Sequence, residues 1–224
     1  MKERCIEVVT IYLVVQHSLL LYFFSHFFPM RKALSALAGT SLLMMSISTV
    51  FAADQTVVVS PANMQGWSFV TETPVGTGTM VNGPATPHLG TGSAELTVNS
   101  TGREILAKSA SGVKLADITS LSYSSYQQTG DVLLEPSLQL QYDSDVTDAN
   151  MAFQGRLVFE PYQSFPAQAN MTGVWQTWQP MTGLWWASPN AVSTVDQACP
   201  QSNPCTWNAI IAAYPNIGLS APFG

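Results

Sequence analysis

Short segments of alternating apolar and polar residues limit most strongly what this chain can fold into. The clearest is 137–142, in which Leu138, Leu140 and Tyr142 alternate with serine and glutamine. A period of two is typical of a strand that buries one face. Turn-forming residues separate this segment from others of similar character. The predicted strands are 56–59, 67–72, 94–98, 105–109, 121–126, 137–142, 154–160, 174–179 and 184–187.

One segment has helical spacing instead. Residues 206–214 place Trp207, Ile210, Ile211 and Tyr214 on one face, with a threonine able to cap the start and a proline after the end. Strands and helices do not alternate along the chain. The predicted fold class is therefore all-β, an antiparallel β-sandwich of jelly-roll or lectin-like type with one short helix near the C-terminus.

Two connections complete this prediction. A loop rich in Gly, Thr and Pro is predicted over 74–93. The Trp-rich strands 174–179 and 184–187 are predicted to pair with each other around a turn at 180–183.

A secretory signal begins at Met30. Two basic residues follow it, then a mostly apolar run, and 50–52 reads Val-Phe-Ala, with small residues at the positions that a signal peptidase recognises. We expect cleavage after Ala52. The predicted location is secreted, periplasmic or cell-surface.

The signal divides the chain into three parts. Residues 1–29 are predicted to be an upstream extension from a start codon assigned too early, 30–52 the signal peptide, and 53–224 a single β-sandwich domain. The alternative for the upstream part is a membrane anchor, since an apolar run there is long enough to span a bilayer, although it contains glutamine and histidine. We expect no stable membrane insertion after cleavage, and a final strand missing after Gly224. Residues 1–52 are left out of the predicted fold.

Charge excludes one class of partner. Residues 53–224 hold four basic and twelve acidic residues, a formal charge of −8. Such a surface repels phosphate backbones, so nucleic acid is not an expected partner. His88 is the single histidine of this region, in a Pro/Gly-rich loop where we expect it to face solvent.

Two cysteines remain after cleavage. Cys199 and Cys205 enclose five residues in CPQSNPC, and an even pair in an exported chain indicates a disulfide. The alternative is a reactive dithiol, but such pairs usually have the CxxC spacing.

An acidic loop is the candidate metal site. Asp143, Asp145, Asp148 and Asn150 offer oxygen ligands between two predicted strands, which indicates a structural Ca²⁺ site. The EF-hand spacing is absent. The alternative is a solvated turn in which these side chains accept hydrogen bonds from their own backbone.

Four tryptophans are the candidate ligand-binding residues. On strands, Trp175 and Trp178 point to opposite faces, as do Trp185 and Trp186, so one of each pair should face outward. Two outward rings on paired strands would form a platform for sugar rings. The alternative is that the loop 74–93 or the predicted helix covers the outward rings.

Catalytic carboxylates give a weaker signal. Glycoside hydrolysis needs two carboxyl groups about 5 to 9.5 Å apart, and no strand triplet of acids or GxSxG motif is present. Glu160 is expected to pair with Arg156. The available glutamates are Glu72, Glu95, Glu104, Glu135 and Glu160.

Several stretches resemble a family of bacterial exported β-sandwich proteins, loosely concanavalin A-like and mostly of unassigned function. They are GWSFVTET (66–73), NGPATPHLGTGSAELTV (82–98), KLADITSLSYSSY (114–126), DSDVTDAN (143–150), QGRLVFEPY (154–162), GVWQTWQP (173–180), GLWWA (183–187) and CPQSNPCTWNAIIAAYPNIGL (199–219). The resemblance implies the fold and export, and no particular chemistry.

The leading prediction is an exported carbohydrate- or surface-binding module, stabilised by calcium, with a polysaccharide or cell-surface glycan as its partner. The first alternative is a secreted polysaccharide-active enzyme, a glycoside hydrolase or lyase, on the same fold. The second is a structural protein of a cell surface or matrix.

Overall fold

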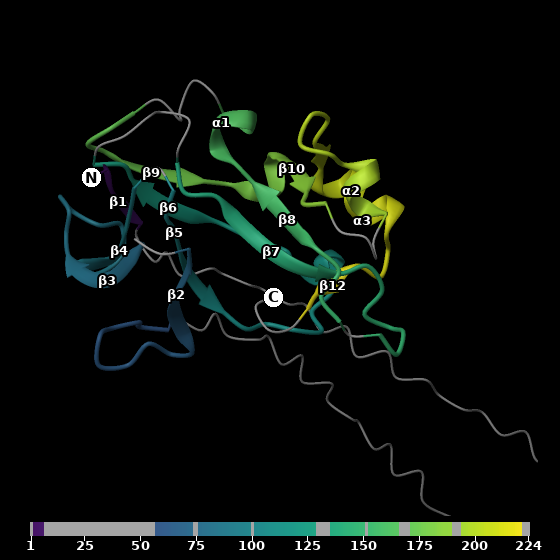
Figure 1. The fold of residues 1–224 in the computed structure, drawn as a ribbon, viewed down its shortest axis with the longest axis horizontal. Coiled ribbons are helices and arrows are strands. Elements are labelled where there is room, and N and C mark those ends of the chain that lie inside the picture. The colour runs from purple at the N-terminus through teal and green to yellow at the C-terminus, as the bar shows by residue number, and fades with distance from the viewer. Residues whose placement is uncertain are drawn as a thin grey trace, which may run out of the picture. The chain divides into compact units, whose positions relative to one another are not determined.

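The computed structural model describes residues 2–6, 57–73, 76–99, 101–128, 135–150, 152–165, 171–189 and 194–220 (Figure 1). These residues form antiparallel strands and a few short helices, which confirms the all-β prediction. None of the helices in the described ranges is long and apolar enough to cross a membrane.

The first sheet has five strands. Their order is β3 (Thr77–Asn82), β4 (Gly92–Val98), β1 (Lys2–Ile6), β6 (Tyr123–Tyr126) and β9 (Trp175–Trp178), and every neighbouring pair is antiparallel. β1 is therefore an inner strand. The sequence analysis did not anticipate it, because residues 1–52 were left out of the predicted fold.

The second sheet also has five strands. Their order is β11 (Cys205–Thr206), β10 (Leu184–Ala187), β8 (Arg156–Phe159), β7 (Leu138–Asp143) and β12 (Gly218–Leu219). β7, β8 and β10 agree closely with three of the predicted strands. Apolar and polar residues alternate along β7, and β8 and β10 are short and mostly apolar.

The other two described strands form a separate two-stranded ribbon. β2 (Trp67–Thr73) pairs with β5 (Arg103–Lys108) in antiparallel register, with Trp67 opposite Lys108 and Phe69 opposite Leu106. Residues two positions apart on a strand point to the same face. The ribbon therefore presents Trp67 and Phe69 together on one side.

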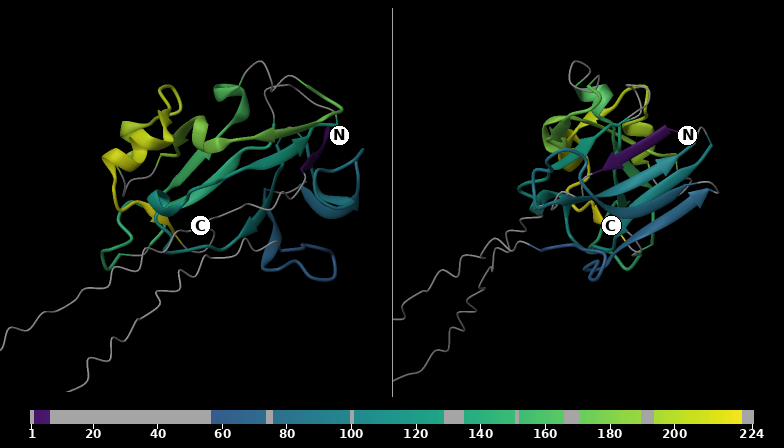
Figure 2. Two further views of the ribbon diagram at one scale, coloured as in Figure 1. Left: turned by 180° about the vertical axis from the view of Figure 1, so that it is seen from behind. Right: turned by 90° about the vertical axis from the view of Figure 1, so that its left-hand side faces the viewer.

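The helices are short. They are α1 (Pro161–Ser164), α2 (Val195–Ala198) and α3 (Trp207–Ala213), with 3₁₀ turns η1 (Leu115–Asp117) and η3 (Pro180–Thr182). Figures 1 and 2 show α2 and α3 beside each other near β10.

The predicted C-terminal helix is confirmed as α3. Thr206 is its N-cap, and its hydroxyl oxygen accepts a hydrogen bond from the Ala209 N–H at 3.2 Å. Trp207 and Ile210 bury the apolar face. The single-turn helices α1 and α2 are additional to the one helix predicted.

Three predicted features differ from the structure. β3 lies inside the predicted loop 74–93, and residues 57–59 form no strand. β9 and β10 do not pair with each other, because each belongs to a different sheet. The intervening η3 carries the chain from one sheet to the other.

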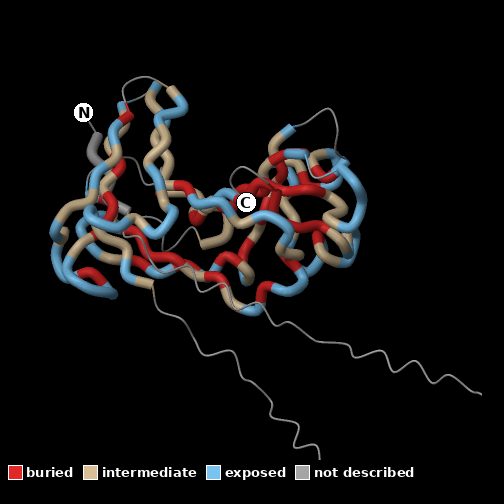
Figure 3. Tube along the Cα trace, turned by 90° about the horizontal axis from the view of Figure 1, so that it is seen from below, coloured by how far each residue is buried: buried red, intermediate tan, exposed pale blue. Residues whose placement is uncertain are grey.

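Both large sheets contribute to one hydrophobic core. β6 and β9 supply Tyr123 and Trp178, and β8 and β10 supply Phe159 and Trp185. Figure 3, seen from below, has many of its buried stretches (red) toward the side that carries β10 and the helices in Figure 1. β2 and β3 are mostly half-buried or exposed.

Candidate functional site

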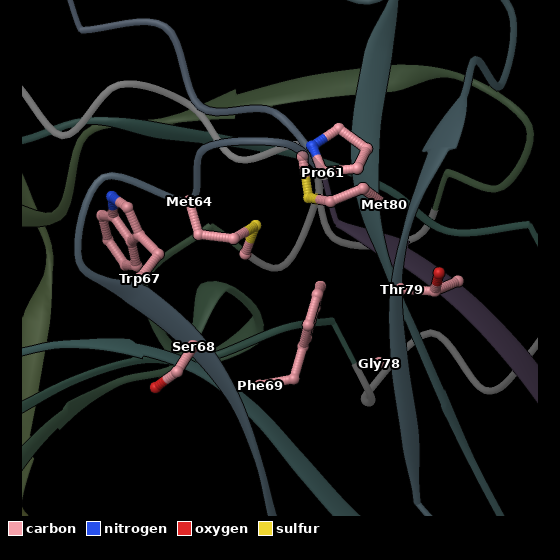
Figure 4. A pocket seen from close by; sticks show the side chains of 8 residues that line it. All are labelled: Pro61, Met64, Trp67, Ser68, Phe69, Gly78, Thr79 and Met80. Atoms are coloured by element: carbon pink, nitrogen blue, oxygen red, sulfur yellow. The ribbon is translucent and has the colours of Figure 1, made fainter.

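An open groove of about 420 Å³ lies between β2 and β3 (Figure 4). Ligand pockets commonly have volumes of roughly 300 to 1,000 Å³. The lining residues are Pro61, Met64, Trp67, Ser68, Phe69, Gly78, Thr79 and Met80.

A tight turn before β2 forms one side of the groove. Ser60 and Asn63 exchange two backbone hydrogen bonds of 3.0 Å, and the Trp67 N–H donates to the Met64 carbonyl at 2.9 Å. This turn holds Pro61 and Met64 at the start of β2. Residues at the turn and on two separate strands therefore line a single groove.

Phe69 and Gly78 form the middle of the groove. Figure 4 shows Phe69 between the strand that carries Trp67 and the strand that carries Gly78. A Cβ atom added to Gly78 would overlap the base of the Phe69 ring. The ring can occupy this position because residue 78 has no side chain.

The chemistry of the groove favours binding. Aromatic rings and thioethers supply polarisable apolar surface, and Ser68 and Thr79 supply exposed hydroxyl groups. None of the eight lining residues, all within the described ranges, is ionisable. The groove therefore has no side chain suited to general acid–base catalysis.

Two of the four predicted ligand-binding tryptophans lie in the core. Trp178 is 1% exposed and Trp185 is 0% exposed. The Trp178 Nε1 donates to Ser125 Oγ at 2.8 Å, and the Trp185 Nε1 donates to the Pro180 carbonyl at 2.9 Å. These rings stabilise the fold and do not reach a ligand from solvent.

Trp175 is half-buried and lies against the segment that follows β3. Its Nε1 donates to the Pro84 carbonyl at 2.9 Å, and its ring lies 5.4 Å from Tyr126 and 6.3 Å from His88, centroid to centroid. This is the predicted alternative in which the region 74–93 covers an outward ring. His88 is exposed, as expected.

Trp186 is half-buried beside a carboxylate. Glu160 Oε2 accepts hydrogen bonds from Trp186 Nε1 at 2.8 Å, from the Tyr162 hydroxyl at 3.3 Å and from Gln201 Nε2 at 3.3 Å. The chain thus brings together two of the residues that the sequence analysis selected separately. We call these four residues the Glu160 cluster.

The predicted platform on paired strands is not formed. Trp175 lies on β9 and Trp186 lies on β10, and these strands belong to different sheets. One ring of each predicted pair is indeed more exposed than the other, as the alternation of strand side chains requires.

The ion pair predicted for Glu160 is also different. Arg156 Nη2 donates to Glu72 Oε1 at 2.5 Å, and Arg103 lies 4.0 Å from the other oxygen of Glu72. A residue of β8 is therefore tied to the β2–β5 ribbon. Glu160 was predicted as the partner of Arg156 only because the two residues are close in the sequence.

A second carboxylate lies inside the protein. Glu135 is 6% exposed, and its Oε2 accepts a hydrogen bond from Ser125 Oγ at 2.8 Å. The buried Tyr123 hydroxyl donates to the Pro136 carbonyl at 2.7 Å. Burial, together with the negative charges of Glu135 and Glu160, raises the pKa of Tyr123 well above its usual value.

The acidic loop consists of successive side chain–backbone turns. Asp143 accepts from the Asp145 N–H at 3.0 Å, Asp145 from the Thr147 N–H at 3.0 Å, and Asp148 from the Asn150 N–H at 2.7 Å. Asn150 in turn accepts from the N–H two residues further on. These bonds are those of the alternative prediction.

The carboxyl groups of Asp145 and Asp143 in this loop have different surroundings. The Thr147 hydroxyl and N–H both donate to Asp145 and lower the pKa of that carboxyl. Asp143 is fully buried, and its Oδ2 accepts no hydrogen bond from the described residues. Among those residues no three His, Cys, Asp or Glu side chains form a metal-binding group, and the calcium site stays a prediction.

The predicted disulfide is confirmed. Cys199 and Cys205 are joined with a Cα–Cα distance of 5.4 Å. Cys199 follows α2 and is buried in the core, and Cys205 begins β11. The bond fixes the loop between α2 and β11 next to α3.

Sequence reasoning missed the groove. The alternation of Trp67 with Phe69 indicated a strand face, but the opposite wall lies in β3, which was predicted to be loop. The Gly-Thr repeats of 76–79 were the available signal, since small residues allow an aromatic ring to approach the backbone.

No model of a known protein family matches this chain, and neither a curated protein nor a solved structure shows significant similarity to it. The resemblance to exported β-sandwich proteins therefore stays a prediction.

Proposed function

We propose that this protein is an exported carbohydrate-binding module with a β-sandwich fold, and that the groove between β2 and β3 is its ligand site. The observation that carries the proposal is the lining of that groove. Trp67, Phe69 and two methionines lie beside exposed hydroxyl groups in one open concavity.

This lining matches the two kinds of surface that a sugar presents. The C–H face of a pyranose ring is apolar and packs on aromatic rings, and its hydroxyl groups exchange hydrogen bonds with small polar side chains. Trp67 and Phe69 are both half-buried, so part of each ring is accessible. Because the groove is open, it is accessible to one unit of a longer chain of sugars.

The charge of the exported part narrows the ligand class. With a formal charge of −8, this region repels anionic polymers. The groove itself contributes no compensating cation. The ligand class that fits is a neutral polysaccharide or neutral cell-surface glycan.

Binding to insoluble polysaccharides and to a glycan array tests this proposal. Trp67→Ala should weaken retention at least tenfold, because it removes the largest ring of the groove. Trp186→Ala is the matched control, since it removes another half-buried tryptophan from a different sheet.

The binding experiment has three informative outcomes. Loss of retention in Trp67→Ala alone supports the groove. Loss in Trp186→Ala alone would move the ligand site to the Glu160 cluster and would contradict the proposed site. Retention of the wild-type protein on no neutral glycan would overturn the proposed function itself.

A further inference from the structure

The groove between β2 and β3 holds more apolar surface than one face of a sugar ring requires. Beside the rings of Trp67 and Phe69 lie three further apolar side chains, those of Pro61, Met64 and Met80 (Figure 4). A sugar ring packs its C–H face on the aromatic rings alone. Flexible thioethers fill irregular space around a small apolar group. The additional side chains therefore indicate an additional apolar group on the ligand.

The polar side chains of the groove are few and of one kind. Ser68 and Thr79 each supply a hydroxyl group, and none of the eight lining residues, all within the described ranges, carries a carboxylate, a primary amide or a guanidinium group. Those groups present two hydrogen-bonding atoms and can engage two neighbouring sugar hydroxyls at once. A sugar with a free hydroxyl on every substituted ring carbon would lose water in this groove without full replacement of its hydrogen bonds.

The backbone of β3 supplies further polar groups at the groove. β3 is the outer strand of its sheet, and no other described strand pairs with its border away from β4. In the register of the β3–β4 pairing, the Gly83 N–H donates to the Thr91 carbonyl at 2.9 Å. Hydrogen-bonded and non-hydrogen-bonded positions alternate along antiparallel strands. The odd-numbered residues of β3 therefore bond to β4, and Gly78 and Met80 direct their N–H and C=O groups to the open border.

An acetamido group complements both features of the groove. Its amide has one N–H donor and one C=O acceptor, which match the backbone groups of Gly78 and Met80. Its methyl group is the small apolar group that the thioethers of Met64 and Met80 would contact. On an amino sugar this group replaces one ring hydroxyl, so the ligand also needs fewer hydroxyl partners.

We propose that the groove selects neutral glycans that contain N-acetylated amino sugars, with the acetamido group of one sugar unit against Gly78 and Met80. The acetylated nitrogen carries no charge, which suits a groove whose lining holds neither a cation nor an anion. Acidic sugars are excluded, because the formal charge of −8 over residues 53–224 repels them. This inference rests on the proposed function and narrows its ligand class.

The test uses the full chain and sugars that differ only at carbon 2 of each ring. The first pair is the β-1,4-linked tetramer of N-acetylglucosamine and the corresponding tetramer of glucose. The second pair is N-acetylgalactosamine and galactose, which have another ring configuration. Titration calorimetry should give a Kd at least tenfold lower for the acetylated member of the first pair, and a preference in the same direction for the second.

Two further measurements locate the acetyl group. In saturation-transfer NMR of the wild-type protein, the acetyl methyl protons of the tetramer should receive more saturation than the ring protons. Met80→Thr removes one thioether and keeps a residue that favours strands, so the preference for the acetylated tetramer should fall below threefold. Met171→Thr is the matched control, because Met171 is 45% exposed and lies outside the lining, and it should keep the full preference.

Several results would overturn the inference while carbohydrate binding stands. They are equal or tighter binding of the non-acetylated sugars, retention on another neutral glycan without binding of either acetylated probe, and saturation of the ring protons equal to that of the acetyl methyl. Loss of the preference in Met171→Thr would also overturn it, since the acetyl group would then contact another part of the protein. Retention on no neutral glycan would overturn the proposed function as well, so the two failures are distinguishable.

Discussion

The ring of Phe69 lies directly over the backbone of Gly78, close enough that a Cβ atom on residue 78 would overlap it. This contact joins β2 to β3 at the centre of the groove. The side chain of Glu104 approaches the same glycine, so the position is enclosed by two side chains of the β2–β5 ribbon.

The first prediction concerns this contact. Gly78→Ala should lower the free energy of unfolding by about 1–3 kcal/mol, because the Phe69 ring must move aside for the added methyl group. Urea unfolding checks the value. Thr79→Ala, at the neighbouring exposed position, is the control and should change stability by less than about 0.5 kcal/mol. Equal effects of the two substitutions would contradict the steric account.

The same pair shows why part of the fold could be predicted and part could not. β7 was predictable because apolar and polar residues alternate along it, and β10 because it is a short apolar run bounded by turn residues. β3 was not, since a Thr- and Gly-rich strand has no apolar period of its own. Its extended conformation depends on pairing with β4 and on contact with Phe69, both of which lie outside the segment itself.

The pairing of strands also could not be predicted from local sequence pattern. A proline- and glycine-bounded turn between two Trp-rich strands is typical of a hairpin. Here Pro180 begins a 3₁₀ turn, and Trp178 and Trp185 on either side of it both enter the core from different sheets. The groove could not be predicted from local sequence pattern for the same reason, since a turn and two separate strands form it.

The second prediction concerns the disulfide between Cys199 and Cys205. Its loop is short, so the loss of chain entropy in the unfolded state should stabilise the protein by roughly 2 kcal/mol. The midpoint of urea unfolding should fall on reduction. A Cys199→Ser, Cys205→Ser variant should start at the lower midpoint and not respond to reductant. An unchanged midpoint of the wild-type protein on reduction would show that the bond adds no stability.

The third prediction concerns Tyr123 and alkaline pH. The folded-state pKa of Tyr123 is raised, so above pH of about 10 the unfolded state loses its proton first. The folded protein then holds more protons than the unfolded one, and stability falls as pH rises. Below pH of about 10 this contribution is fully present.

Tyr123→Phe provides the check. The variant should lose about 1 kcal/mol at pH 8, because the hydrogen bond to the Pro136 carbonyl is removed. Its stability should then decline less steeply than that of the wild-type protein between pH 10 and 11. Parallel curves for the two proteins would mean that another group governs the alkaline loss.

The fourth prediction concerns the charge of Asp145. Its pKa is lowered by Thr147, so the carboxylate contributes stability above its unfolded pKa of about 3.9, and that contribution is lost as pH falls through the folded value. Thr147→Ala removes the hydroxyl donor and should raise the pKa of Asp145, as measured by NMR titration of the side-chain carboxyl. Asp148→Asn, in the next side chain–backbone turn of the same loop, should leave the Asp145 titration nearly unchanged. A Thr147→Ala titration identical to wild type would exclude the hydroxyl as the cause.

The fifth prediction tests the calcium site that the sequence predicts in the same loop. Asp143 Oδ2 is buried without a hydrogen-bond donor among the described residues, whereas one oxygen of Asp145 and one of Asp148 already accept backbone N–H groups. Calcium would neutralise the buried charge, so CaCl₂ should raise the melting temperature of the wild-type protein and a chelator should reverse the change. Asp143→Asn should abolish this response, since the amide supplies no negative charge. A wild-type melting temperature indifferent to both calcium and chelator would leave the loop as a series of side chain–backbone turns.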